Sequence, residues 1–276
     1  MKKLTTLLVM LFFTAGMAIG QNNETTITQV TSNNSASVDQ LGMDNEATIT
    51  QKGGNQNVAH IDQSSDPNET GIIISTIFQD GANNDARTVG TRKNSASSET
   101  EQRQVGSENI ARINQGLPLG TNRGTTLTQV QVGNLNFATM SGNNSYQAEQ
   151  RQVGNRNDAR TSGGGKNANI FQEQLGNDNI ARINGLSFAS SDQLQFGDRN
   201  LSILENVGHD GPGESYLTRQ DGNDNDARLT ANGNGGVLDV RQTGNLNTAI
   251  VDWTTSLNTT TINQNGFQNT AVVNSN

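Results

Sequence analysis

Cysteine is absent from this chain of 276 residues, which also has only three prolines, two histidines and one tryptophan. Without cysteine the chain can form neither a disulfide framework nor a thiolate metal site. Its histidines, His60 and His209, lie far apart in the sequence and in unlike contexts, so they indicate neither a zinc or iron site nor a hydrolytic triad. We therefore expect no cofactor, no bound metal and no enzymatic activity.

Apolar residues are scarce as well. Only 31% of the residues are hydrophobic and 4% are aromatic, whereas about 45–50% of an ordinary globular domain is apolar when glycine is counted. Composition alone would predict a disordered chain. The formal net charge is −8, and phosphate binding requires clustered Lys and Arg, so we expect no nucleic-acid partner and no simple adhesion to anionic lipid.

The longest apolar run lies at the start of the chain. Lys2 and Lys3 precede an apolar stretch from Leu7 to Ile19, and small residues lead on to Gln21. A charged start, a short apolar core and a small-residue end predict a secretory signal peptide over residues 1–20. No later stretch is long enough to cross a bilayer. We expect an exported protein without membrane insertion.

A short frame of residues recurs along the rest of the chain: Gln, any residue, Gly, two residues, Asn, one residue and Ala. Its glutamines are Gln40, Gln79, Gln104, Gln131, Gln152, Gln174, Gln195, Gln220, Gln242 and Gln264. Its asparagines are Asn45, Asn84, Asn109, Asn136, Asn157, Asn179, Asn200, Asn225, Asn247 and Asn269. Its glycines are Gly42, Gly81, Gly106, Gly133, Gly154, Gly176, Gly197, Gly222, Gly244 and Gly266. Ser202 replaces Ala in one copy, a copy at Gln51 carries an insertion, and a weaker copy at Gln29 has Thr31 in the glycine place.

The spacing of the frame predicts a stack of repeats. From Gln131 to Gln264 the glutamines are separated by 21, 22, 21, 25, 22 and 22 residues, and a fixed period in this range is typical of solenoids. We expect about eleven repeats in one continuous solenoid, with a less regular part over residues 21–103 and a regular array over residues 104–276. The less regular part contains Pro67.

Each repeat is predicted to be a strand, a tight turn and a second strand. On both sides of Gly133 the residues alternate with period two, and β-branched residues are frequent. Gln, Gly, Asn, Ala and a following aliphatic residue share one alternating set, while the other set varies freely. The constant set is therefore expected to face the interior. An isolated pair of strands is marginal in water, but stacked pairs bond to the repeats above and below at about 4.8 Å per repeat.

Gln and Asn are unusual core residues, and stacking explains how they can be buried. In a column of identical residues each side-chain amide donates to one copy and accepts from another, so buried polar groups are satisfied. The predicted fold class is therefore an all-β solenoid with an amyloid-like cross-β core, built from repeats of about 22 residues. We expect the glutamine and asparagine columns to form its assembly core.

The frame Gln-x-Gly-x-x-Asn-x-Ala, with a second Gln eleven residues on at Gln51 and Gln115, resembles the curlin repeat of bacterial curli fibres. The resemblance implies a secreted subunit of functional amyloid fibres at the cell surface and in the biofilm matrix. It implies self-assembly, other curlin-like subunits as partners, and export through curli-type outer-membrane secretion machinery. This chain differs in having more repeats and an additional Gln two residues before many of the frame glutamines. Major subunit, minor subunit and nucleator therefore remain open.

Two further interpretations compete at the surface. Asp-Ala-Arg units such as Asp158 to Arg160 place charges on the variable face, where they either tune lateral contacts and bind a matrix polymer or keep that face solvated. The alternative function is a monomeric secreted β-solenoid that binds ice, polysaccharide or another surface. Asp221 to Asp226 only faintly matches a calcium loop, since Asp226 and Asn232 stand where Gly and Glu belong.

Overall fold

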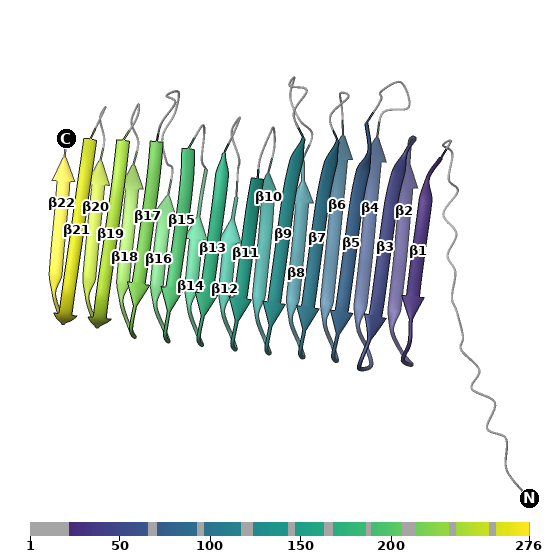
Figure 1. The fold of residues 1–276 in the computed structure, drawn as a ribbon, viewed down its shortest axis with the longest axis horizontal. Coiled ribbons are helices and arrows are strands. Elements are labelled where there is room, and N and C mark those ends of the chain that lie inside the picture. The colour runs from purple at the N-terminus through teal and green to yellow at the C-terminus, as the bar shows by residue number, and fades with distance from the viewer. Residues whose placement is uncertain are drawn as a thin grey trace, which may run out of the picture.

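The computed structural model consists of two parallel β-sheets of eleven strands each, which lie one behind the other along a single stack (Figure 1). It describes residues 22–65, 71–92, 97–116, 124–142, 147–162, 168–185, 189–205, 214–231, 236–253 and 258–275. The predicted signal peptide, residues 1–20, lies outside the described residues, as do Pro67 and His209. The predicted all-β solenoid is confirmed.

We call the sheet of odd-numbered strands sheet A and the sheet of even-numbered strands sheet B. Sheet A consists of β1 (Glu24–Gln29), β3 (Asn45–Lys52), β5 (Ile73–Asp80), β7 (Ser98–Val105), β9 (Thr125–Val132), β11 (Gln147–Val153), β13 (Asn169–Leu175), β15 (Ala189–Phe196), β17 (Glu214–Asp221), β19 (Gly236–Asn245) and β21 (Asn258–Phe267). Sheet B consists of β2 (Ser35–Leu41), β4 (Val58–Ser65), β6 (Asp85–Arg92), β8 (Ile110–Gln115), β10 (Phe137–Gly142), β12 (Asp158–Thr161), β14 (Ile180–Ile183), β16 (Leu201–Glu205), β18 (Asp226–Ala231), β20 (Thr248–Trp253) and β22 (Thr270–Ser275).

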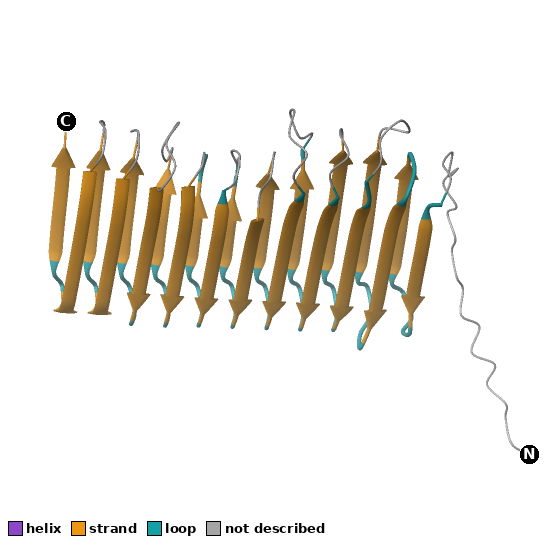
Figure 2. Cartoon of the chain, turned by 45° about the horizontal axis from the view of Figure 1, so that its top comes forward, coloured by secondary structure: helices purple, strands orange, loops and turns teal. Residues whose placement is uncertain are grey.

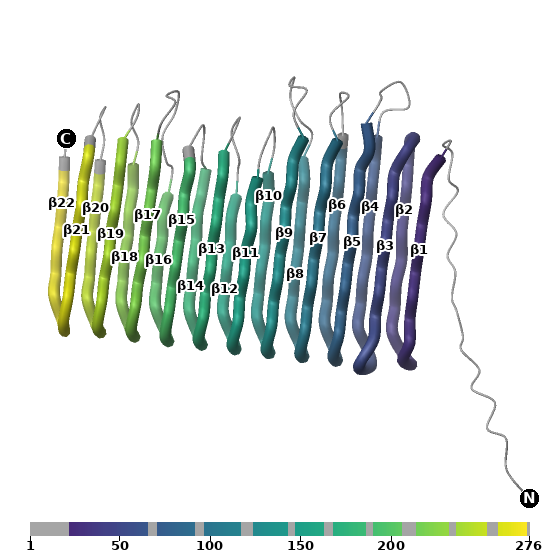
Figure 3. Tube along the Cα trace, viewed as in Figure 1, coloured from purple at the N-terminus to yellow at the C-terminus, as the bar shows by residue number. Residues whose placement is uncertain are grey.

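One coil of the solenoid is a strand of sheet A, a tight turn and the next strand of sheet B. The tight turns all lie along one edge of the stack, the lower edge in Figures 1 and 2. Each strand pairs in parallel with the strand two places further along the chain, as β9 does with β11. Equivalent residues of successive coils therefore lie directly beside one another, and the tube trace shows the strands following each other in sequence order along the stack (Figure 3).

Period-two alternation decides which side chains enter the space between the sheets. In β9 the buried residues are Thr125, Leu127, Gln129 and Gln131, and the residues between them are partly or fully exposed. The core combines such amides with the aliphatic residues after the repeat alanines, for example Ile113 and Met140, which are both 1% exposed. Ser202, in the alanine place, is fully buried and accepts a hydrogen bond from Gln193 Nε2 (3.0 Å).

One part of the register predicted from the sequence is wrong. Gln40 lies in β2 and pairs with Gln63 of β4, so it belongs to sheet B and not to the column that contains Gln79. Gly42 accordingly lies in the connection between β2 and β3, and Asn45 is the first residue of β3, at the opposite edge from the other frame glycines. The column position assigned to Gln40 is occupied by Gln51, which pairs with Gln29 and Gln79. The frame occurs at both connections of the first coil, half a coil apart, and this caused the error.

Candidate assembly core and stack ends

The frame glutamines of sheet A form one continuous column between the two sheets. Gln131 is fully buried, accepts from Gln104 Nε2 (3.0 Å), and donates to Gln152 Oε1 (2.9 Å) and to the backbone carbonyl of Ile110 in sheet B (2.9 Å). Each amide thus joins three coils and both sheets. The same amide-to-amide bond links successive members of the column, which are Gln29, Gln51, Gln79, Gln104, Gln131, Gln152, Gln174, Gln195, Gln220, Gln242 and Gln264.

A second glutamine column runs beside the first through the middle coils. Gln129 donates to Gln150 Oε1 (2.9 Å) and to the carbonyl of Arg112 (3.1 Å), so its amide is satisfied in the same way. Its members are Gln102, Gln129, Gln150, Gln172 and Gln193. They recur two residues before the frame glutamine, and this spacing was the signal that placed them on the same face of the strand.

The frame asparagines form a column at the inner side of the tight turns. Asn136 donates from Nδ2 to Asn109 Oδ1 (3.1 Å) and to the carbonyl of Gly154 in the next coil (2.8 Å). Its own Oδ1 accepts from both the backbone and side-chain nitrogens of Asn157 (3.1 Å each). The side chain therefore holds three successive turns together. The column contains Asn34, Asn57, Asn84, Asn109, Asn136, Asn157, Asn179, Asn200, Asn225, Asn247 and Asn269.

The glutamine and asparagine columns have opposite directions. Gln104 donates to Gln131, toward the C-terminal end of the stack, whereas Asn136 donates to Asn109, toward the N-terminal end. Each end of the stack therefore differs chemically from the other end.

The glycine at each tight turn is required for two reasons. Gly133 has a φ of 117°, a region that residues with a Cβ avoid, and a Cβ there would lie 1.9 Å from the carbonyl oxygen of Gly154. The other frame glycines of these turns, from Gly81 to Gly244, have the same close approach to the next coil. Gly266 in the last coil has no nearer neighbour than Asn269 Nδ2, at 3.5 Å.

Residues outside the predicted set also link the turns. Asn134 donates to Asn155 Oδ1 from both its backbone and side-chain nitrogens (3.1 Å each), and Asn155 makes the same bonds to Asn177. Sequence reasoning missed this partly exposed column, although the recurring Gly-Asn pairs were a signal for it. Ion pairs add to the links: Arg156 pairs with Asp178 (2.6 Å) and Arg199 with Asp224 (2.7 Å). These guanidinium hydrogen bonds lower the pKa of Asp178 and Asp224.

A family model, the curlin associated repeat, matches residues 20–53. This chain contains a curlin repeat. The matched segment is the first coil and the beginning of the second, and within it Gln29 to Ala36 and Gln40 to Ala47 carry the frame at both connections. No curated protein matches the chain. The match extends over part of the chain, so the number of curlin repeats is not established by it.

The two ends of the stack expose bonding groups that inner coils use. At the C-terminal end, Gln264 donates to the carbonyl of Thr248 (2.9 Å) but has no next amide to donate to, and Asn269 Oδ1 has no donor among the described residues. At the N-terminal end, Gln29 donates to Gln51 Oε1 (2.7 Å), and its own Oε1 accepts from no described residue. Phe267 and Val272 near the last coil and Val30 near the first are more than half exposed.

The described residues contain no group of three or more His, Asp or Glu side chains placed to hold a metal ion. A search of the same residues finds no helix that is both long and apolar enough to span a membrane. The buried tyrosine, Tyr216, lies 3.5 Å from the carboxylate of Glu214, and burial with that nearby charge raises its pKa. The residues with well-defined bonding roles are therefore the stacked amides.

Proposed function

We propose that this curlin-repeat protein is a secreted structural subunit of curli-like amyloid fibres, and that copies add head to tail at the ends of the stack. One observation carries the proposal: the bonding groups unused at one end are the complements of those unused at the other. A free amide hydrogen of Gln264 and Oδ1 of Asn269 stand at the C-terminal end, and Oε1 of Gln29 stands at the N-terminal end.

A second copy placed with its first coil on the last coil of this chain would continue the columns of frame glutamines and frame asparagines. Gln264 Nε2 would donate to the next copy's Gln29 Oε1, and the next copy's Asn34 would donate to Asn269 Oδ1. These bonds repeat those between Gln131 and Gln152 and between Asn157 and Asn136 inside the chain. The exposed backbone groups of the terminal strands would be paired by the same step, as open sheet edges favour.

Two identical ends cannot join in this way. Two C-terminal ends would bring amide donors against donors and carbonyl acceptors against acceptors, and their strands could not continue a parallel sheet. Addition in a single direction leaves a fresh end after every step, and such a non-closing contact produces filaments. Export by the predicted signal peptide, placement in the biofilm matrix, and the roles of a curli-type exporter and other curlin-like subunits belong to the proposal.

The test is seeded assembly of residues 21–276, followed by circular dichroism, thioflavin T binding and electron microscopy. We expect β signal, dye binding and filaments to rise after a lag, and preformed filaments to remove the lag. Gln264→Glu should slow seeded elongation at neutral pH by about tenfold or more, because a carboxylate would face the carbonyl oxygen of Gln29 across the seam, and tenfold corresponds to only about 1.4 kcal/mol. Acidification should restore growth, since a protonated carboxyl can donate.

Asn263→Asp is the matched control, because it adds the same charge one residue earlier, on the exposed outer face of β21. Equal slowing by both variants would show that net charge causes the effect, and it would contradict the proposed bond from Gln264 to Gln29 of the next copy. Immediate β signal from a monomer that never forms filaments would contradict polymerisation as a whole. It would favour the monomeric binding module.

A further inference from the structure

Two rows of apolar side chains lie on the outer faces of the middle coils, one on each sheet. On sheet A the residue before each turn glycine is apolar from β7 to β15, and the row consists of Val105, Val132, Val153, Leu175 and Phe196. On sheet B the residue after each frame asparagine gives the row Ile110, Phe137, Ile180 and Leu201, interrupted by Asp158. All these side chains are partly exposed.

Both rows stop at the same coils. The sheet A row is bounded by Asp80 in β5 and Asp221 in β17, and the sheet B row by Asp85 in β6 and Asp226 in β18. The two faces thus carry apolar stripes of equal extent along the stack, and Asp158 is the one charged residue within them.

The two rows also lie at the same height above the turn. Gln152 Nε2 donates to the carbonyl of Phe137 (3.0 Å), and Val153 follows Gln152 directly in β11. The adjacent column, two residues further from the turn, repeats the relation, with Gln150 Nε2 donating to the carbonyl of Thr139 (3.0 Å). A second copy displaced perpendicular to the sheets, without rotation, would therefore bring the sheet B row of one copy onto the sheet A row of the other.

In that placement the charges of the two faces are complementary at the coil of Arg182. Sheet B carries a column of arginines two residues beyond its apolar row: Arg87, Arg112, Arg160, Arg182 and Arg228. In the coils of Arg112 and Arg160, sheet A has an arginine beside each glutamate, Arg103 with Glu101 and Arg151 with Glu149. In the coil of Arg182 it has Phe171 and Glu173 and no arginine. Each arginine side chain of sheet B can reach these residues of sheet A, because their distance from the turn differs from its own by no more than about two residues. Strands rise about 3.3 Å per residue.

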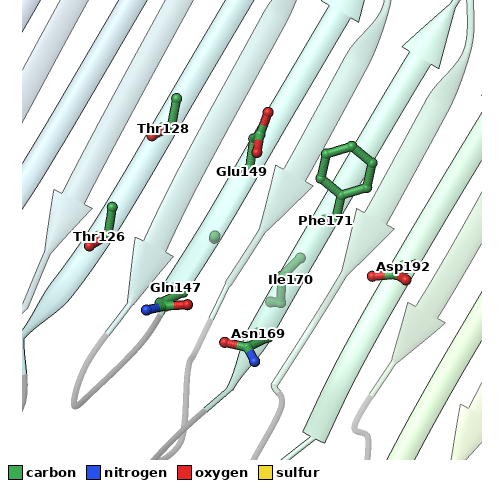
Figure 4. A pocket seen from close by; sticks show the side chains of 9 residues that line it. Thr126, Thr128, Gln147, Glu149, Asn169, Ile170, Phe171 and Asp192 are labelled. Carbon is green, nitrogen blue, oxygen red and sulfur yellow. The ribbon is translucent and has the colours of Figure 1, made fainter.

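The position facing Arg182 is a shallow groove of about 350 Å³ (Figure 4). Phe171 lies in it between Glu149 and Asp192, which pair with it in register on either side. Neither carboxylate has an ion-pair partner among the described residues, and Arg182 has only a distant one, Asp158 at 3.9 Å. A guanidinium over an aromatic ring with a carboxylate on each side is a favourable arrangement.

We infer that stacks of this protein associate side by side, with the outer face of sheet B of one copy packed on the outer face of sheet A of the next. The apolar rows pack against each other on both sides of Asp158, and Arg182 of one copy enters the groove at Phe171 of its neighbour. Only a partner with the same spacing of strands can match one side chain per coil along both rows, so the partner is a second copy of this chain. This inference rests on the proposed function, because the contact is strong only when it repeats along filaments.

The size of the contact explains that dependence. The matched coils span about 24 Å along the stack and about 20 Å along the strands, or about 1,000 Å² of total buried surface, at the lower limit for a specific interface. A contact of this size is weak between single chains, but it repeats with every subunit of a filament and is strengthened by multivalency. We expect filaments first and bundles afterwards.

The test compares filaments of residues 21–276 with those of Leu175→Lys by electron microscopy and by sedimentation of bundles. Leu175→Lys should leave elongation and thioflavin T binding unchanged, because the side chain lies outside the core, and should give separate single filaments. Thr243→Lys is the matched control: Thr243 occupies the same place in β19, beyond the apolar row, and its filaments should bundle as the wild type does.

A charge exchange tests the register. Arg182→Glu should reduce bundling at low salt, and Arg182→Glu combined with Glu149→Lys and Asp192→Lys should restore it. Bundling of Leu175→Lys and Arg182→Glu filaments equal to the wild type would overturn the inference while leaving head-to-tail growth intact. If no variant forms filaments, the proposed function fails, and sedimentation of the soluble chain decides the face contact. A wild-type dimer that Leu175→Lys abolishes would support it, and a monomer at every concentration would overturn it.

Discussion

At the scale of single residues, the same residue type contributes very differently to the stability of the fold at different places in the coil. Gly154 has a φ of 123°, and a Cβ there would lie 1.8 Å from the carbonyl oxygen of Gly176, whereas a Cβ on Gly185 would have no atom within 4 Å. Gln152 is fully buried in a column of amides, whereas Gln147 on the same strand is exposed. Position in the coil, rather than composition, therefore sets the cost of a substitution.

Gly154→Ala should lower the free energy of unfolding by at least about 2–3 kcal/mol, because it adds both backbone strain and a collision with the next coil. The measurement is the denaturant midpoint of the soluble chain. Gly185→Ala serves as the control and should shift that midpoint little. A similar shift for both variants would show that the turns do not approach each other closely.

Gln131→Leu should destabilise the chain by about 3–6 kcal/mol. It removes the side-chain donor of Gln152 Oε1 and of the carbonyl of Ile110, and one of the two acceptors of Gln104 Nε2, which keeps its bond to the carbonyl of Asp85. Each buried unsatisfied group costs about 1–3 kcal/mol. Gln147→Leu changes the same residue type at a position where the side chain has no hydrogen bond to another described residue, so it should cost under about 0.5 kcal/mol. Comparable losses in the two variants would argue against the column.

At the scale of elements, the sequence predicted the strand–turn–strand unit and its inward face, because period-two alternation is a local property. It could not distinguish the two edges of the first coil. Gln29, Gln40 and Gln51 are eleven residues apart and carry similar frames, so only the pairing of β2 with β4 shows that Gln40 lies on the other sheet. On sheet B, Gly90 stands between Gln63 and Gln115, so the pair of amides Gln40 and Gln63 is not continued in the next coil, and a Cβ on Gly90 would lie 3.2 Å from Ile73 Cγ2.

The ion pairs between successive turns were also beyond sequence reasoning, since they join residues about one coil apart. Arg156 holds the pKa of Asp178 below its usual value, and Arg199 does the same for Asp224. A carboxyl whose pKa is lowered by folding stabilises the fold above its unfolded pKa, and this contribution is lost as the pH falls through the folded pKa. Both pairs are exposed, so the effect is small and sensitive to salt.

We therefore expect Asp178→Asn with Asp224→Asn to be slightly less stable than the wild type at pH 6. The difference should shrink below about pH 4, where free aspartates titrate, and vanish at lower pH. Denaturant midpoints at low ionic strength measure it. Asp62→Asn removes a carboxylate that has no ion-pair partner among the described residues, and it should show no such trend. A difference that persists at pH 2 would rule out the ion pairs as its cause.

At the scale of the whole molecule, every coil makes nearly the same bonds with its neighbours. Gln242 and Asn247 occupy the places in the columns that Gln264 and Asn269 occupy one coil later. Removing a complete coil should therefore expose an equivalent end, whereas removing half a coil should not.

Deletion of residues 254–276 is expected to leave the rate of seeded elongation within about twofold of the wild type, because the new last coil presents the same amides. Deletion of residues 268–276 removes β22 and Asn269 but keeps β21, so sheet A would end one strand beyond sheet B. That variant should elongate at least about tenfold more slowly. Slow growth after both deletions would mean that the last coil has a role that its neighbours cannot take over.

The edge opposite the tight turns has a practical consequence. Between β16 and β17 the chain has residues 206–213, but between β18 and β19 only residues 232–235, and the strands on either side keep their register. Added length at such a connection costs only about 0.6 kcal/mol per doubling. A foreign peptide inserted there would leave the columns undisturbed, and a filament of such chains would display one copy of it per subunit, in a line along one margin of the fibre.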